Sequence, residues 1–145
     1  LVVQANAQRL NVELISENIG ETPIKTSGAL HTYLAVADTH QCRLEGLSGA
    51  RYLDKLRDFA ESEQQGTLAV QGAVDRIYHT NEAVRIGKQS SDSTVVWHPN
   101  NDLPSDTPVD VARHFICVEA ANTRLDPVWL VPGAQHLLGT TLSRS

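Results

Sequence analysis

The stretch HFICVEAAN, residues 114–122, joins a strong strand pattern to a charge. Its apolar run from Phe115 to Val118 predicts a buried β-strand. Successive side chains of a strand point to opposite faces, so Phe115, Cys117 and Glu119 share one face. A carboxylate there costs several kcal/mol unless it is paired, or else its pKa rises until it is neutral. Packing alone therefore does not explain why Glu119 stands in this strand.

Other short segments with strand patterns lie on both sides of this stretch, separated by turn residues. Residues 8–18 alternate, with Leu10, Val12 and Leu14 on one face, and a hairpin turn is expected at residues 18–23. Further strands are expected at residues 24–36, 42–47, 67–79 (two strands, divided near Gly72), 82–87, 93–99 and 128–138.

Two segments are less regular. Residues 53–66 predict a loop or a short helical turn, and the proline-containing residues 98–110 predict a loop. Many short strands divided by turns predict an all-β fold, an antiparallel β-sandwich. At this length we expect one domain over residues 1–145.

The composition excludes several classes of function. The chain is 41% hydrophobic and 20% charged, as is usual for a globular protein. Its net charge of −5 argues against nucleic acid and against a polybasic membrane contact. We see neither a membrane span nor a signal peptide. Cys42 and Cys117 lie in apolar segments, which favours buried free thiols, a reducing compartment and a cytoplasmic protein.

Two more polar residues break the strand pattern as Glu119 does. Alternation places His31 on one face with Tyr33, and Asp75 on one face with Ile77. Each of the three could be structural, as a hydrogen-bonded histidine or as an acid that faces water. An acid could also pair with a nearby arginine, such as Arg76 or Arg113.

The functional alternative is acid–base chemistry. A buried glutamate gains basicity and a histidine titrates near neutrality, so both can exchange protons at working pH. Such a pair suits a reaction that removes one proton and delivers another nearby, for example the opening of a sugar hemiacetal. No metal site is expected, because the six histidines are scattered and neither His-x-His nor Cys-x-x-Cys occurs. A G-x-S-x-G elbow and a glycine-rich phosphate loop are also missing.

Six segments, taken in order, resemble one known family. They are TSGALHTYLAVAD (26–38), GLSGARYLDKL (46–56), VDRIY (74–78), STVVWHP (93–99), FICVEAAN (115–122) and LVPGAQHLL (130–138). Together they are similar to the C-terminal half of the D-hexose-6-phosphate mutarotases, or glucose-6-phosphate 1-epimerases, from about Leu10 to Leu138. The resemblance implies a galactose mutarotase-like sandwich, of which this chain, which contains no Met, is expected to be the C-terminal part.

The same resemblance implies an isomerase that interconverts the α and β anomers of hexose 6-phosphates. It assigns His31 as general acid, Glu119 as general base and Asp75 as a binder of sugar hydroxyls. No cofactor and no metal are implied, the substrate is a small hexose phosphate, and the full-length protein is expected to be a monomer. Where the family usually has Asn before Pro, this chain has His98, whose role stays open.

Two other functions compete with this one. The chain could be an aldose 1-epimerase for unphosphorylated sugars, because the arginines expected to hold the phosphate belong to the family's N-terminal half. It could also be a carbohydrate-binding sandwich without catalysis, although its 5% aromatic content offers few platforms for sugars.

Overall fold

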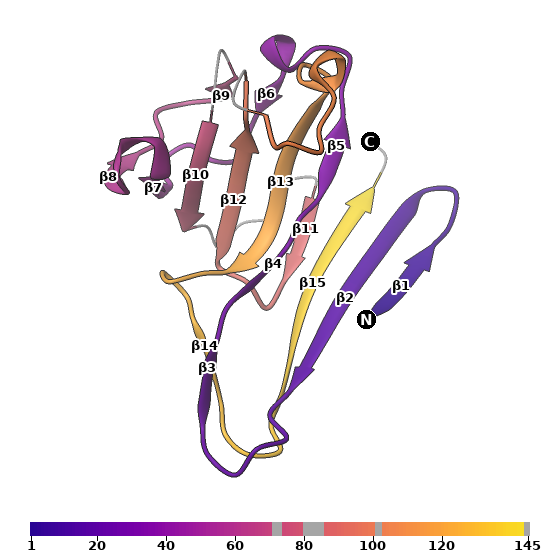
Figure 1. Ribbon diagram of the computed structural model, residues 1–145, viewed down its shortest axis with the longest axis vertical. Helices are drawn as coiled ribbons and strands as arrows, with labels where there is room; N and C mark the ends of the chain where they lie inside the picture. The colour runs from indigo at the N-terminus through magenta and orange to yellow at the C-terminus, as the bar shows by residue number, and fades with distance from the viewer. Residues whose placement is uncertain (71–73, 80–85, 101–102, 144–145) are drawn as a thin grey trace. The chain divides into compact units, whose positions relative to one another are not determined.

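The computed structural model describes residues 1–70, 74–79, 86–100 and 103–143, and within residues 74–79 only the side chain of Arg76 (Figure 1). Across this part of the chain the regular elements are β-strands and three short 3₁₀ turns, and the pairings with a described register are antiparallel. The predicted all-β antiparallel class is confirmed. None of the described helices is long and apolar enough to cross a bilayer.

The chain forms two compact units. Unit 1 comprises Leu1–Leu30, Asn81–Ser93 and Glu119–Ser145, and unit 2 comprises His31–Thr80 and Thr94–Val118. The division passes through strand β13 (Phe115–Asn122), whose first four residues belong to unit 2 and whose last four belong to unit 1.

Unit 1 is built on a sheet of four strands in the order β1-β2-β15-β11. These strands are β1 (Val2–Ala5), β2 (Arg9–Glu17), β15 (Gln135–Ser143) and β11 (Ile86–Gln89). β2 and β15 pair along their full lengths, so the alternating stretch at residues 8–18 forms the predicted strand. Asn6 closes the β1–β2 turn, where its Oδ1 accepts hydrogen bonds of 2.9 Å from the backbone N–H groups of Gln8 and Arg9.

Two smaller pairings complete unit 1. β3 (Ile24–Thr26) pairs with β14 (Val128–Leu130), and β4 (Gly28–Leu30) pairs with the last three residues of β13. The hairpin predicted at residues 18–23 is therefore wrong, because the strand that follows does not pair with β2. The buried Asn18 explains the different path: its Nδ2 donates hydrogen bonds of 2.9 Å to the carbonyls of Thr22 and Leu130, which ties the turn to β14.

Unit 2 contains a sheet in the order β13-β12-β10-β7-β8, with β5 also paired to β13, and a separate pair of β6 and β9. The strands are β5 (Tyr33–Ala35), β6 (Arg43–Leu44), β7 (Arg51–Asp54), β8 (Ala60–Glu63), β9 (Leu68–Ala69), β10 (Val74–His79) and β12 (Ser93–His98), whose first residue belongs to unit 1. The 3₁₀ turns are η1 (Thr39–Gln41), η2 (Lys55–Arg57) and η3 (Val109–Val111). The buried apolar side chains of unit 2 include Leu47, Val70, Val96, Ile116 and Cys117.

Several predicted strands are divided or missed. The segment 24–36 forms three short strands, with His31 and Thr32 outside them. The segment 128–138 forms β14 and the start of β15, because Pro132 cannot donate to a ladder and Gly133 has a positive φ of 75°. β1 was not expected, and neither was β8 within the predicted loop at residues 53–66, where η2 is the predicted helical turn.

Asp126 joins two segments of unit 1 that lie about thirty residues apart. Its carboxylate accepts hydrogen bonds from the backbone N–H of Asp92 (2.9 Å) and Thr123 (2.8 Å), and from the hydroxyl of Ser93. Burial by itself would raise the pKa of Asp126, but the hydrogen bonds from Ser93, Thr123, Asp92 and Asn122 hold the pKa below its ordinary value of 3.8. Asp126 is therefore charged in the folded protein, where its carboxylate is the acceptor of these hydrogen bonds.

Replacing Asp126 by Asn should lower the free energy of unfolding by about 1–3 kcal/mol at neutral pH, because N–H donors lose a charged acceptor. Since folding lowers its pKa, the stabilisation by Asp126 is present above pH 3.8 and is lost as the pH falls through the folded pKa. Urea unfolding of the complete polypeptide that carries this sequence measures both effects. Asp106→Asn, in an exposed loop of unit 2, is the control, and equal stability of the two variants would contradict the role of Asp126.

His98 ends β12 inside the core of unit 2. Its side chain is 0% exposed, its Nε2 lies 3.4 Å from Thr39 Oγ1, and its ring meets the Phe115 ring edge to face at 6.3 Å. Burial is the main cause that lowers the pKa of His98 below 6.5; a backbone hydrogen bond with Phe115 opposes this shift, and the charge of His40 adds to it. His98 is thus a neutral packing residue in the folded state.

Because unfolded His98 takes up a proton at higher pH than folded His98, its contribution to stability should be lost as the pH falls below about 6.5. His98→Gln should flatten the decrease in unfolding free energy between pH 6.5 and 5, measured by urea unfolding. The exposed His114 of the same unit, replaced by Gln, is the matched control. If the unfolding free energy of the His98→Gln variant falls with pH as steeply as that of the unchanged protein, His98 does not cause the acid sensitivity.

Candidate active site

His31 lies in unit 2, two residues before β5 begins, at a position exposed to solvent. The exposed residues in this stretch are Ala29, His31, Tyr33 and Ala35, and the residues between them are half-buried. The predicted alternation of side chains is therefore confirmed, although His31 itself is not part of a strand. His31 and Thr32 form the two-residue link between β4 and β5.

Aromatic rings surround the imidazole of His31. The ring of Tyr33 stacks on it, with centroids 4.8 Å apart and planes inclined by 9°. The ring of Trp97, from β12, meets it edge to face at 5.8 Å and 87°. Phe115, from β13, contacts the rings of Tyr33 (5.2 Å) and Trp97 (5.9 Å). We call these four side chains the ring cluster; all belong to unit 2.

The surroundings of His31 affect its protonation. Partial burial lowers the pKa of His31 below 6.5, because a charged imidazolium loses hydration among these rings. A proton held there is released more readily than one on an isolated histidine, which is a useful property for a proton donor.

Glu119 lies in unit 1, as the first residue of the unit 1 part of β13. The residue is only 4% exposed, and Ala120 and Ala121 beside it are 0% exposed. The prediction that the strand is buried is confirmed, and the carboxylate is buried with it. Such a position restricts the access of water to the carboxylate.

Hydrogen bonds from the segment before β12 hold this part of β13 in place. Ser91 Oγ donates to the carbonyl of Ala121 (2.6 Å) and accepts from its N–H (3.0 Å). Asn122 Nδ2 donates to the carbonyl of Ser90 (3.0 Å). With the Asp126 network, these bonds hold the backbone of the residues that follow Glu119 in β13.

Asp75 lies in β10, next to Arg76, which pairs in register with Asp54 of β7. The side chain of Asp75 lies outside the described residues. Arg76 forms an ion pair with Asp54 at 3.3 Å. The other arginine that could have neutralised a candidate acid, Arg113, forms an ion pair with Asp38 at 2.7 Å. Both arginines thus bind aspartates that the sequence did not single out.

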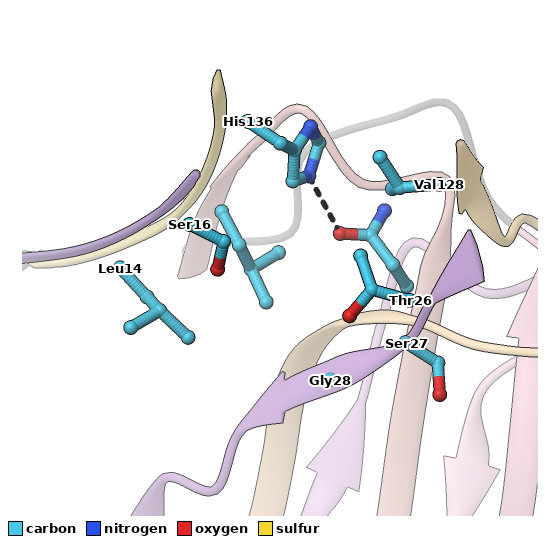
Figure 2. Close-up of a pocket in the computed structure, with 9 residues that line it drawn as sticks. Leu14, Ser16, Thr26, Ser27, Gly28, Val128 and His136 are labelled. Carbon is cyan, nitrogen blue, oxygen red and sulfur yellow. Dashed lines mark hydrogen bonds between the residues drawn. The ribbon is translucent and has the colours of Figure 1, made fainter. Parts of the chain in front are cut away.

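Figure 2 shows a pocket in unit 1 with a volume of about 40 Å³. Leu14 and Ser16 lie on one side of it and Thr26, Ser27 and Gly28 on another. Nε2 of His136 donates a hydrogen bond of 2.8 Å to Asn122 Oδ1 (dashed line in Figure 2). Sites for small organic ligands usually measure roughly 300 Å³ or more, so this pocket suits water rather than a sugar.

Sequence reasoning missed the aromatic environment of His31. Tyr33 could have been found, because a residue two positions from His31 on an extended chain shares its face. Trp97 and Phe115 come from strands far away in the sequence, and alternation within one segment says nothing about them.

The prediction of free thiols is confirmed: Cys117 is buried and Cys42 is half-buried, and neither forms a disulfide.

Comparisons with known sequences agree with this arrangement. The aldose 1-epimerase family model matches residues 3–143. A protein of Escherichia coli K12 named "Putative glucose-6-phosphate 1-epimerase" is 31% identical over 125 residues, which cover 75% of this chain and 42% of that protein. One of the same name from Cenchrus ciliaris is 27% identical over 143 residues, 87% of this chain and 43% of that protein. The chain thus spans less than half the length of these relatives.

Solved structures show the same fold. A "putative mutarotase" from Salmonella typhimurium superposes with a TM-score of 0.80 at 24% identity, over 94% of this chain and 50% of that one. A "Putative aldose 1-epimerase" from Escherichia coli K12 gives 0.70 at 16% identity, over 97% and 57%. The predicted galactose mutarotase-like fold is confirmed by these likenesses. With a family model that matches nearly its whole length, this chain belongs to the aldose 1-epimerase family.

Proposed function

We propose that the protein carrying this chain interconverts the α and β anomers of hexose 6-phosphates, with glucose 6-phosphate as substrate. The observation that carries the proposal is the acid Glu119, only 4% exposed in a strand whose other buried residues include Phe115, Cys117 and Ala121. Membership of the aldose 1-epimerase family supports the reaction class, and two relatives named "Putative glucose-6-phosphate 1-epimerase" support the substrate.

In the proposed reaction Glu119 takes the proton of the anomeric hydroxyl while His31 protonates the ring oxygen. The bond between the anomeric carbon and the ring oxygen breaks, and the open-chain aldehyde forms. Rotation about the bond from the anomeric carbon to its neighbour exposes the other face of the carbonyl. Closure returns each proton in reverse, so the protein ends the cycle unchanged.

The properties of the two residues suit these roles. A buried carboxylate is poorly hydrated and accepts a proton more readily than an exposed one. Partial burial lowers the pKa of His31, which makes its proton easier to transfer. Asp75 is proposed to accept hydrogen bonds from sugar hydroxyls, a task that requires no change of protonation.

Replacing Glu119 by Gln preserves shape and removes the base, so the rate of anomerisation should fall by about 10²- to 10⁴-fold. His31→Asn should reduce it by a similar factor, and the double variant should be little worse than either, because the two act in one proton-transfer step. Exchange NMR between the anomers of glucose 6-phosphate measures the rates on the complete polypeptide. Glu21→Gln, at an exposed glutamate of unit 1, is the control, and an active Glu119→Gln variant would refute the mechanism.

The substrate class is tested separately. Hydrogen bonds to a charged group contribute about 1.5–3 kcal/mol, so kcat/KM should be at least about tenfold higher for glucose 6-phosphate than for glucose. Equal rates, or a preference for glucose or galactose, would instead make the protein an aldose 1-epimerase for unphosphorylated sugars. Binding of saccharides without any acceleration of anomer exchange would indicate a carbohydrate-binding sandwich.

A further inference from the structure

The ring cluster places the aromatic face of Tyr33 against the face of His31. A centroid distance of 4.8 Å with nearly parallel planes is a stacked arrangement, in the range of about 4.5–7 Å that aromatic pairs adopt. Trp97 stands edge-on to both rings, at 5.8 Å from His31 and 6.4 Å from Tyr33. One face of the imidazole is therefore covered by Tyr33, and Trp97 stands at a right angle to it.

This contact addresses a difficulty of the proposed acid. His31 lies outside the strands at an exposed position, and the terminal torsion of a histidine is broad and roughly two-fold. Its imidazole could adopt several orientations if nothing packed against it. Proton transfer requires the donor nitrogen within hydrogen-bond reach of the acceptor, so a rotating ring would spend much of its time misplaced.

Tyr33 is well held itself. It is in β5, which pairs with β13 in the register Tyr33↔Cys117, and its ring packs on Phe115 at 5.2 Å. Phe115 is 8% exposed, whereas Tyr33 is 55% exposed. The ring of Tyr33 thus packs on the buried Phe115 and also stacks on His31.

We propose that Tyr33 is a positioning residue for the general acid: its ring fixes the plane of the His31 imidazole so that the N–H points at the sugar ring oxygen. The inference rests on the proposed function, in which His31 is that acid. In this proposal the ring of Tyr33 positions the imidazole of His31, and the hydroxyl of Tyr33 has no part in it.

The test compares Tyr33→Leu, which removes the ring, with Tyr33→Phe, which keeps the ring and removes the hydroxyl. In the complete polypeptide, Tyr33→Leu should lower kcat for glucose 6-phosphate anomerisation about ten- to hundred-fold with little change in KM, because the acid is misplaced by about an ångström. Tyr33→Phe should restore kcat. Tyr33→Met, a second variant without a ring, must behave as Tyr33→Leu does.

A spectroscopic measurement reports on the ring without any substrate. Protons above an aromatic face are shielded, so the Hε1 resonance of His31, assigned from its loss in His31→Gln, should move downfield in Tyr33→Leu and stay in place in Tyr33→Phe. Tyr52→Leu is the matched control, because Tyr52 is in β7, separated from β5 by β13, β12 and β10, or roughly 19 Å at 4.8 Å per strand.

The outcomes separate this inference from the proposed function. If the unchanged protein does not accelerate anomer exchange, the proposed function fails, and the resonance of His31 alone decides whether Tyr33 holds the ring. If the protein is active, a Tyr33→Phe variant as impaired as Tyr33→Leu would overturn the inference in favour of the hydroxyl. A raised KM with an unchanged kcat would overturn it too, since Tyr33 would then be a platform for the sugar.

Discussion

The burial of strand β13 is the constraint on which most of this structure depends. All eight of its residues are buried, and one of them is an acid. A strand buried on both faces needs neighbours on both edges, because each backbone N–H and C=O must find a partner. β12 lies along one edge of β13, and β4 and β5, both from residues 28–35, also pair with β13. The short polar segment Ser90–Ser93 adds hydrogen bonds at its end, so the sequence around β13 is organised to keep it in place.

Much of the fold could be predicted where hydrophobic patterns are strong. β2, β12 and β13 combine apolar or β-branched residues with alternation or burial, and they form where expected. β8 has the sequence AESE and is exposed throughout, so no hydrophobic pattern marks it; its pairing with β7 makes it a strand. The prediction of a hairpin at the turn that begins at Asn18 was wrong for a related reason. Its direction is set by a side-chain hydrogen bond to Leu130, more than a hundred residues away.

The candidate site shows the same limit. His31 and Glu119 were found because a polar residue in an apolar alternating segment needs an explanation, and that reasoning uses only neighbours in sequence. Trp97 and Phe115 were not linked to His31, since no local pattern states that β12 and β13 lie side by side. Strand order is decided by long-range pairing. The family resemblance supplied roles for single residues, whereas the environment of each residue had to come from the structure.

The two proposed catalytic residues are treated in opposite ways by the fold, and the difference follows from their tasks. A base gains strength from poor hydration, and Glu119 is accordingly buried in a fully formed strand that fixes its backbone. An acid that must reach a sugar ring oxygen needs to be accessible, and His31 is exposed and lies between strands. Exposure reduces the packing that fixes a buried ring, and in our proposal part of the orientation comes from a neighbouring ring. Stacking on Tyr33 provides it while leaving the edge of the imidazole, where both nitrogens lie, outside the stacked face.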